Sequence, residues 1–375
     1  MYNLAVELDE RFAPPALAHV RHEIERRGLE VRDDGADDRV AAWIDAEFGG
    51  WWSVEARNGR TLTFWDAAGP VGFVTVDVRG MRFPWLRGAA RDPATGLFGP
   101  VGVARSRRGS GLGAALTIVG LGMLHASGYR RALIAAVTGE RLLRWYARVA
   151  GARPIESFER DALFGTPAPA AILASGNGTN AQAVLEATRD GRLPVRPIAV
   201  VCNRPQARVL ERTRDFDVMP LVVTWERGRE SRADYDTRLI GAIEALRVEL
   251  VLLLGWMHLL NRAFVERFPE TLNLHPAFLP FDPCSDTVIA PDGVEIPAFR
   301  GAHAVRDALR AGSPWVGASV HRITVEVDRG PVLVRAPLRV HRGEEEAAVM
   351  ERLHPLEHRV VLDAVRRWAY ERNAP

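Results

Sequence analysis

Between residues 170 and 274, short apolar runs alternate with stretches of helical periodicity, and this alternation constrains the fold more than any other feature of the sequence. The apolar runs lie at 170–174, 198–202, 221–224, 250–254 and 271–274. Strands that alternate with helices form a parallel sheet covered on both faces, and ligands bind at the C-terminal ends of such strands. We therefore predict an α/β fold with a Rossmann-like parallel sheet in this half of the chain.

The chain is long enough for two cores, since it has 375 residues. The segment Gly165-Thr-Pro-Ala-Pro-Ala170 combines two prolines with small residues, which is typical of a linker. We predict one domain over residues 1–164 and a second over 165–375. In the first, helical and strand-like stretches alternate, and 61–65 with 71–78 are predicted to form a hairpin.

The composition is that of a globular protein, with 47% hydrophobic and 26% charged residues and a net charge of +2. This near balance gives no reason to expect a nucleic-acid partner. The chain contains no lysine, which excludes a lysine nucleophile or Schiff base. Its two cysteines, Cys202 and Cys284, predict neither a disulfide framework nor a metal site and fit a reducing cytoplasm.

We also expect no membrane partner. The N-terminus carries acidic residues where a signal peptide would be basic, and no apolar run is long enough to span a bilayer. The oligomeric state is left open, a homodimer included.

Asn273-Leu-His275-Pro276 and the later turn Val327-Asp328-Arg329-Gly330-Pro331 supply an amide, an imidazole and a carboxylate. Acyl transfer can use this trio: the amide holds an oxyanion, the imidazole moves a proton, and the carboxylate sets the charge of the imidazole. We expect Asp328 to raise the pKa of His275, so that Asn273 and a protonated His275 both donate to the oxyanion. The alternative is a capped turn with a satisfied histidine.

The turn Ser175-Gly-Asn-Gly-Thr-Asn180 follows the first strand of this half and begins a helix. Backbone amides at such a position point outward and bind anions, phosphate best of all. The alternative is an ordinary tight turn. A dinucleotide is less favoured, because the third glycine of the usual pattern is missing.

Residues 170–373 resemble the glycinamide ribonucleotide formyltransferase family, which is folate-dependent. The motifs that carry the resemblance occur in the order of that family. Besides the two motifs and the turn just described, they are Cys202-Asn203, Ser231-Arg-Ala-Asp-Tyr-Asp236, Leu254-Gly-Trp-Met-His-Leu-Leu260, Asn273 to Pro280, Gly317-Ala-Ser-Val-His321 and Glu357-His358.

The resemblance implies transfer of a formyl group from 10-formyltetrahydrofolate to the amine of a small molecule. It implies a catalytic role for Asn273, His275 and Asp328. The implied substrate site, for phosphate and for a ribose or amine, consists of Gly178, Thr179, Asn180, Arg232 and Glu357. The implied folate wall consists of Met257, His258, Leu259, Leu260 and the backbone at 323–328.

Three departures from the family leave the identity of the amine open. His258 stands where the family has arginine, His354 stands where it has glutamine, and residues 281–297 replace a short loop next to the reacting site. Glycinamide ribonucleotide is the first candidate, and a different small amine of a specialised pathway is the alternative. Methionyl-tRNA formyltransferase shares the trio but has a further C-terminal domain for tRNA, which we do not expect here, so a tRNA substrate is not favoured.

In the N-terminal half, Arg108-Gly-Ser-Gly-Leu-Gly113 lies between a strand ending at Val103 and a helix. Amides of such a loop bind pyrophosphate. Residues 30–162 resemble the GNAT acyltransferase superfamily, which implies a GNAT-like mixed sheet with helices in this domain. The resemblance implies that acetyl-CoA or another acyl-CoA binds at Val103, Arg108, Gly109, Gly111 and Gly113. It also implies that Tyr146 protonates the departing thiolate.

Two alternatives stay open for this half. The glycine-rich loop could begin a helix that binds nothing, which would leave a binding or structural module, and Tyr146 could simply pack in a core. Trp51, Trp52 and Trp65 are candidates to line a substrate groove, although burial is the commoner role of such residues.

Overall fold

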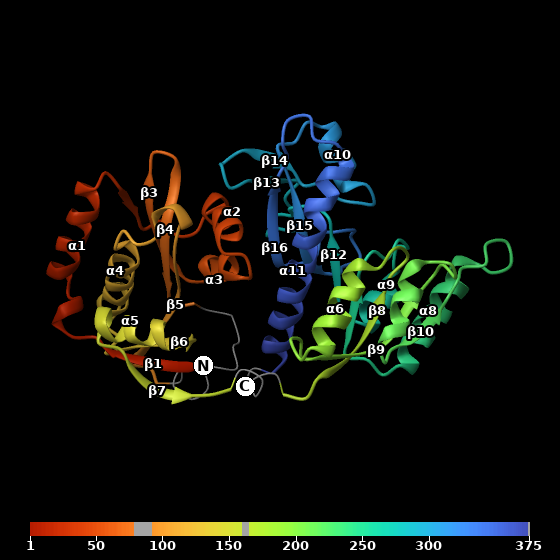
Figure 1. Ribbon diagram of the computed structural model, residues 1–375, viewed down its shortest axis with the longest axis horizontal. Coiled ribbons are helices and arrows are strands. Elements are labelled where there is room, and N and C mark those ends of the chain that lie inside the picture. Colours follow the sequence, from red (N-terminus) through yellow and green to blue (C-terminus); the bar gives the residue numbers. More distant parts are fainter. Residues whose placement is uncertain (79–91, 160–164, 374–375) are drawn as a thin grey trace. The chain divides into compact units, whose positions relative to one another are not determined.

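The computed structural model describes residues 1–78, 92–159 and 165–373 (Figure 1). The chain forms two compact units: the first comprises residues 1–165 with 291–293 and 370–375, and the second comprises 166–290 with 294–369. Residues 160–164, on the N-terminal side of the predicted domain boundary, lie outside the described residues. None of the described helices is long and apolar enough to span a membrane.

Unit 1 contains a mixed sheet with the strand order β2-β3-β4-β5-β6-β1-β7. Its strands are β1 (Tyr2–Glu7), β2 (Glu30–Arg32), β3 (Arg60–Asp66), β4 (Gly69–Val76), β5 (Thr95–Val103), β6 (Arg131–Val137) and β7 (Arg153–Ser157). The predicted hairpin is confirmed as β3 and β4. Strands β5 and β6 run parallel, whereas the other described pairs of this sheet are antiparallel.

Helices cover both faces of this sheet. They are α1 (Pro14–Arg26), α2 (Asp38–Glu47), α3 (Trp52–Asn58), α4 (Leu112–Ala126) and α5 (Glu140–Ala150). Strand β4 is buried along its whole length, and its side chains alternate between two apolar cores. Val74 packs in a core with residues of α1 and α4, whereas its neighbour Phe73 packs with residues of α2 and α3.

Unit 2 contains a seven-stranded sheet with the order β10-β9-β8-β11-β12-β15-β16. The strands are β8 (Ala168–Leu173), β9 (Val195–Cys202), β10 (Met219–Val222), β11 (Leu250–Leu253), β12 (Thr271–His275), β15 (Trp315–Arg322) and β16 (Val332–Arg339). The first five are parallel, as predicted. The sheet continues with β15 and β16, which the sequence interpretation did not assign, and β15 pairs antiparallel with both β12 and β16.

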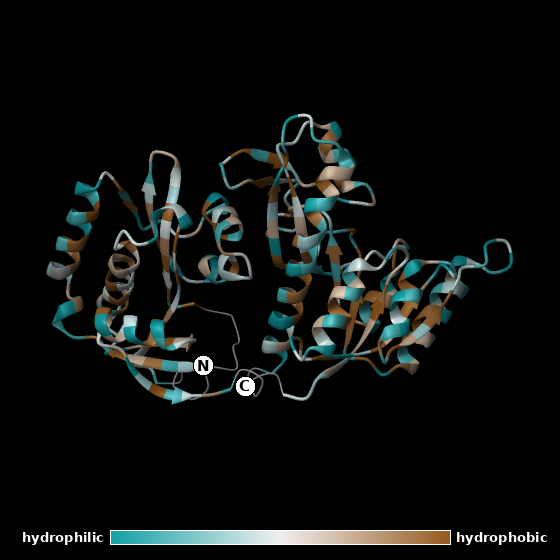
Figure 2. Ribbon diagram, viewed as in Figure 1, coloured by the Kyte–Doolittle hydropathy of each residue, from teal (hydrophilic) through white to brown (hydrophobic). Residues whose placement is uncertain are grey.

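The helices of unit 2 are α6 (Thr179–Arg189), α7 (Arg208–Arg212), α8 (Arg232–Ala245), α9 (Arg262–Arg267), α10 (Ala304–Arg310) and α11 (Glu346–Arg372). Side chains of α8 and α9 pack on one face of the sheet with Leu173, Val201 and Leu253. The alternating residues Ala170 and Ile172 are also fully buried, so the opposite face is covered too. In Figure 2 the strands are mainly brown, whereas the helices carry teal residues.

A separate two-stranded hairpin, β13 (Thr287–Ile289) and β14 (Glu295–Pro297), occupies the segment that departs from the resembled family. The amide of Ala298 donates to the carbonyl of Asp286 at 2.8 Å, which closes the base of this hairpin. The hairpin therefore returns the chain to Phe299 at a defined place beside the end of β12.

Candidate active sites

Strand β12 places Asn273 and His275 on one face of the unit 2 sheet. Alternate residues of a strand point to the same side, so these two residues share a face at the C-terminal end of β12. The antiparallel register of β15 sets His321 directly opposite Asn273. His275 and His321 are both buried, with 4% and 2% of their surface exposed.

Asp328 reaches the same place from the turn between β15 and β16. Its φ of +53° is left-handed, a conformation that aspartate tolerates better than most residues. A Cβ at Gly330 would lie 1.6 Å from the carbonyl oxygen of Arg322, so only glycine permits this close approach. Oδ2 of Asp328 lies 3.5 Å from Nδ1 of His275, and Oδ1 lies 3.3 Å from Nδ2 of Asn273. The structure thus brings the three predicted residues together.

His321 is a fourth member of this group, and the sequence interpretation gave it no role. Its Nδ1 donates to the carbonyl oxygen of Arg322 at 2.8 Å. Nε2 lies 3.1 Å from Nδ2 of Asn273 and 3.5 Å from Oδ1 of Asp328. His321 ends one of the family motifs noted in the sequence, which was the signal that could have identified it. Its proximity to Asn273, however, depends on the antiparallel strand β15, which was not predicted.

Burial and hydrogen bonding shift the pKa of Asp328 in opposite directions. Burial raises the pKa of this carboxyl, but the bond with His321, the charge of His275 and the amide of Gly301 outweigh burial and lower the pKa to about 2. Asp328 is therefore ionised at neutral pH.

The expected rise in the pKa of His275 is wrong. Burial lowers the pKa of this imidazole by more than Asp328 and the carbonyl of Phe299 raise it. The neutral imidazole is the main form at neutral pH, so its first task is to accept a proton, and the imidazolium that results lies beside Asp328.

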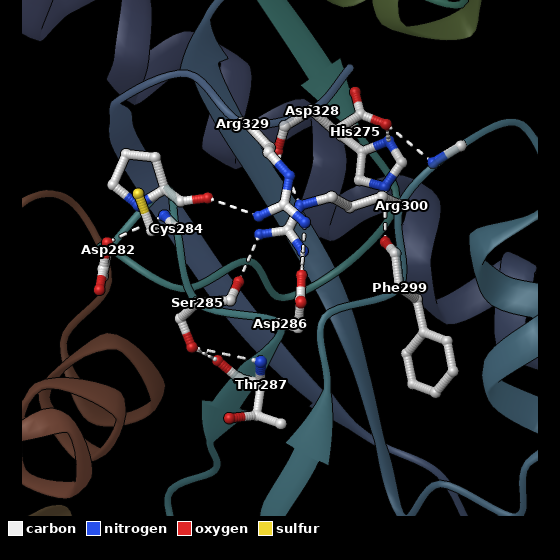
Figure 3. Close-up of polar contacts among 12 residues, drawn as sticks. His275, Asp282, Cys284, Ser285, Asp286, Thr287, Phe299, Arg300, Asp328 and Arg329 are labelled. Carbon is white, nitrogen blue, oxygen red and sulfur yellow. Dashed lines mark hydrogen bonds and ion pairs between the residues drawn. The ribbon is translucent and has the colours of Figure 1, made fainter. Parts of the chain in front are cut away.

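Protein acceptors already engage the donors of this group. Nε2 of His275 lies 2.8 Å from the carbonyl oxygen of Phe299 (Figure 3). The side-chain amide of Asn273 faces both Asp328 and His321. The predicted role of Asn273 and His275 as oxyanion donors therefore requires that a substrate oxygen replace one of these acceptors.

The predicted phosphate loop begins helix α6. Gly178 has a left-handed φ of +77° and precedes the first helical residue, Thr179, so the first amides of the helix point outward. Arg212 fixes the loop through the carbonyl oxygen of Asn177 at 2.7 Å. A Cβ at Gly176 would meet no atom within 4 Å, which leaves open space beside the loop.

Asn180 and Glu357 meet beside this loop, with Nδ2 of Asn180 2.9 Å from Oε2 of Glu357. Burial raises the pKa of Glu357, against the hydrogen bond from Asn180 and the charge of His354, which both lower it. A buried carboxylate is suited to a ribose hydroxyl or an ammonium group, which would stabilise its charge.

Arg232 was predicted to bind phosphate, and its contacts do not support that role. Its Nε bonds Oδ1 of Asp236 at 2.7 Å, and a second nitrogen bonds the carbonyl of Leu259. These contacts join Arg232 to the predicted folate wall. In that wall, Met257 and Leu259 are 51% and 67% exposed, so their apolar side chains are accessible to an apolar ring of a ligand.

The other two predicted wall residues lie deeper. His258 is surrounded by the rings of Trp225, Tyr235 and Trp256, and burial together with the charge of Arg232 lowers its pKa. Leu260 packs against the core of unit 2. His258 and Leu260 therefore contact other residues of the protein, and we expect them to position Met257 and Leu259 rather than to contact a ligand.

With this geometry established, comparison with known proteins assigns the C-terminal half. The family model described as formyl transferase matches residues 169–286 and 295–365, just over half of the chain. The chain belongs to the formyl transferase family. The match omits residues 287–294, which form most of the β13–β14 hairpin. Because the match begins at residue 169, it gives no information about the N-terminal part of unit 1.

Two relatives of this family member are phosphoribosylglycinamide formyltransferases. That of Escherichia coli is 33% identical over 190 residues, which cover 50% of this chain and 81% of the relative. That of Mycobacterium tuberculosis is 34% identical over 200 residues, covering 53% of this chain and 84% of the relative. A solved structure, glycinamide ribonucleotide transformylase 1 from Symbiobacterium toebii, is 34% identical with a TM-score of 0.48, covering 55% of this chain and 89% of that one.

Unit 1 contains a cavity of about 1140 Å³ at a place where its two parallel strands separate. The pairing of β5 with β6 ends at Phe98 and Ile134, although both strands continue. The cavity is lined by all six residues that the sequence assigned to an acyl-CoA site: Val103, Arg108, Gly109, Gly111, Gly113 and Tyr146. Gly109 and Gly111 have φ near +80°, and Gly111 directly precedes helix α4.

Tyr146 lines this cavity and is also buried, with 6% of its surface exposed. Its ring packs against Trp145 and Phe98, and burial raises the pKa of the phenol. The phenol is thus protonated at neutral pH and can act as a proton donor.

Of the three tryptophans considered for a groove, two line this cavity, namely Trp51 and Trp52. Trp65 is buried, with the guanidinium of Arg32 3.9 Å from the centre of its ring. Its role is in packing.

Proposed function

We propose that unit 2 transfers a formyl group from 10-formyltetrahydrofolate to the primary amine of a small substrate. The observation that carries this proposal is the meeting of Asn273, His275 and Asp328 at the C-terminal end of β12. Membership of the formyl transferase family supports it, as do the exposed apolar side chains of Met257 and Leu259.

The co-substrate supplies the formyl carbon, and the residues of the chain supply proton transfer and charge stabilisation. A bond forms between the amine nitrogen and the formyl carbon, and the bond from that carbon to the folate nitrogen breaks. Neutral His275 accepts the proton that the amine loses, and Asp328 stabilises the imidazolium. His275 then returns the proton to the leaving nitrogen, while Asn273 donates to the oxyanion. The products are a formamide and tetrahydrofolate, and the protein is unchanged.

Glycinamide ribonucleotide is our first candidate for the amine. It is supported by the names of the relatives and by the loop at Gly178, whose outward amides suit a phosphate. Another small amine is the alternative, because the β13–β14 hairpin changes the surroundings of the reacting group.

The test is to incubate the full chain with 10-formyltetrahydrofolate and a panel of primary amines that includes glycinamide ribonucleotide, and to identify products by mass. We expect a mass increase of one formyl group on one amine, formed at a far lower rate by His275→Ala. Turnover of another amine alone would replace glycinamide ribonucleotide. Absence of formyl transfer to every amine would overturn the proposal.

We infer a second function for unit 1, the binding of acetyl-CoA or another acyl-CoA for N-acyl transfer, as in the GNAT superfamily. The specific observation in favour is the cavity between the separated strands, with a glycine-rich helix start on its wall. Backbone amides of that loop suit a pyrophosphate, and Tyr146 can protonate a departing thiolate.

Calorimetric titration of the full chain with acetyl-CoA tests this function. Saturable binding together with release of free thiol in the presence of an amine supports an acyltransferase, and one amine accepted by both units would indicate a dual formyl and acetyl transferase. Binding without thiol release would reduce unit 1 to a binding module. Absence of binding would overturn the inference.

A further inference from the structure

The segment between Phe281 and Phe299 contacts two arginines, Arg300 and Arg329, which lie near His275 and Asp328 in Figure 3. Oδ1 of Asp286 accepts from both arginines: Nη1 of Arg300 lies 3.4 Å away, and Nη2 of Arg329 makes a shorter contact. One carboxylate therefore bridges two guanidinium groups.

Backbone carbonyls of the same segment complete the arrangement. Nη2 of Arg300 donates to the carbonyl of Ser285 at 2.7 Å, and Nη1 of Arg329 donates to that of Pro283 at 2.9 Å. Each guanidinium thus has a fixed orientation relative to the segment 283–286, because such a group binds two acceptors in a rigid fork.

Both arginines are next in sequence to a residue of the Asp328 site, Arg300 to Gly301 and Arg329 to Asp328. Nε of Arg300 donates to the carbonyl of Asp328 at 3.2 Å, and the next residue, Gly301, donates its amide to Oδ2 of Asp328 at 2.8 Å. Arg329 follows Asp328 directly. The left-handed backbone of Asp328 is strained, so it needs such contacts from outside its own turn.

An exposed ion pair by itself contributes little, and the side chain of Asp286 is 77% exposed. Its partners differ, because the side chains of Arg300 and Arg329 are only 14% and 28% exposed. The two guanidinium groups repel each other across a partly dry site, and Asp286 offsets that repulsion. Removal of its charge would therefore separate the two arginines and loosen the Asp328 turn.

We propose that Asp286 is a positioning residue for formyl transfer, which bridges Arg300 and Arg329 and thereby holds Asp328 against His275. This inference rests on the proposed function of unit 2 and adds a residue to it. Asp286 is the last residue matched by the family model before the gap at 287–294. The bridge to Arg300 and Arg329 therefore begins where this chain departs from the family.

The test compares Asp286→Asn with the parent in the full chain by two measurements. Hydrogen exchange followed by mass spectrometry reports on the Gly301 amide, and it needs no activity. We expect the peptide that contains Gly301 to exchange about tenfold faster in the variant. Steady-state kinetics of formyl transfer should show a fall of about tenfold in kcat, with KM for both substrates within about twofold of the parent.

Three further variants control the test. Asp282→Asn removes a charge from the same segment. The side chain of Asp282 accepts from the amide of Cys284 at 2.9 Å and does not bridge the two arginines (Figure 3), so both measurements should match the parent. Asp286→Glu keeps the bridging charge and should restore most of kcat and of the protection. Arg329→Gln breaks the bridge from the other side and should reproduce the faster exchange.

The outcomes separate the two proposals. If Gly301 exchanges in Asp286→Asn as it does in the parent, Asp286 does not hold the turn and the inference is overturned, whether or not the parent is active. If the exchange changes but kcat does not, the positioning role is overturned as well. If the parent itself transfers no formyl group, the proposed function fails, and the exchange result still decides whether Asp286 holds Asp328.

Discussion

The two units of this chain assemble their candidate sites in different ways. In unit 2 the reacting groups are polar side chains that converge from strands β12 and β15 and from a strained turn at Asp328. In unit 1 the candidate site is a cavity between separating strands, lined by backbone amides of a glycine-rich loop and by a single buried phenol, Tyr146. The first arrangement specifies a reaction, whereas the second mainly specifies a shape and a charge that a ligand must match.

The largest effect should come from the trio in unit 2. His275→Ala and Asp328→Asn should each lower kcat for formyl transfer about 100- to 1,000-fold, since each removes a group that acts in the transition state. KM should change far less, which steady-state kinetics with 10-formyltetrahydrofolate would show. A turnover number within a few-fold of the parent would remove the contrast between a reactive unit 2 and a binding unit 1.

The next effect concerns the glycine-rich loop of unit 1. Gly111→Ala should weaken acetyl-CoA binding by about tenfold or more, because φ of +83° disfavours any residue with a Cβ and the loop would change its path. Calorimetric titration measures the change. The matched control is Gly128→Ala at the other end of helix α4, where φ is +88° and open space surrounds the Cβ. Equal weakening by both variants would show that the loop has no special role.

Tyr146→Phe tests whether unit 1 does chemistry. Loss of the phenolic proton should lower thiol release from acetyl-CoA about tenfold or more while binding and formyl transfer stay unchanged. Release of thiol is followed with a thiol-reactive dye. If release persists at the parent rate, Tyr146 has only the packing role that its contacts with Trp145 and Phe98 already show.

The smallest effect is on the pH dependence of formyl transfer. Burial lowers the pKa of His275 below its ordinary value of 6.5, so the neutral imidazole persists in the folded protein as the pH falls through 6.5. We expect kcat to stay level down to that pH and to fall only below it, as measured from about pH 5 to 8. A fall that begins above 6.5 would instead support the raised pKa expected from Asp328 alone.

The same shift affects stability with a defined sign. The unfolded chain takes up a proton on His275 near pH 6.5, whereas the folded chain resists it. The contribution of His275 to the free energy of unfolding is therefore complete above pH 6.5 and is lost as the pH falls from 6.5 toward the lower folded pKa.

Local chemistry made much of this protein predictable. The parallel strands β8 to β12, the helices between them and the glycine loops at Gly178 and Gly111 depend on periodicity and backbone preference within a few residues. For the same reason Asn273 and His275 could be placed at the C-terminal end of a strand. The turn at Asp328 offered a candidate carboxylate, but its catalytic role was supported by the order of the family motifs, because its partners are distant in sequence.

Three features were decided by the tertiary structure. The antiparallel strand β15 sets His321 opposite Asn273, a pairing that no local pattern encodes. Burial at the end of β12 reverses the expected direction of the pKa shift of His275, since desolvation depends on everything packed around the ring. The bridge from Asp286 to Arg300 and Arg329 joins segments on either side of a hairpin and a strand. The sequence by itself determined which reactive groups the chain contains and that two of them lie at the end of a strand. Only the folded structure decided their charges and their partners, because burial and long-range contacts act on all of them at once.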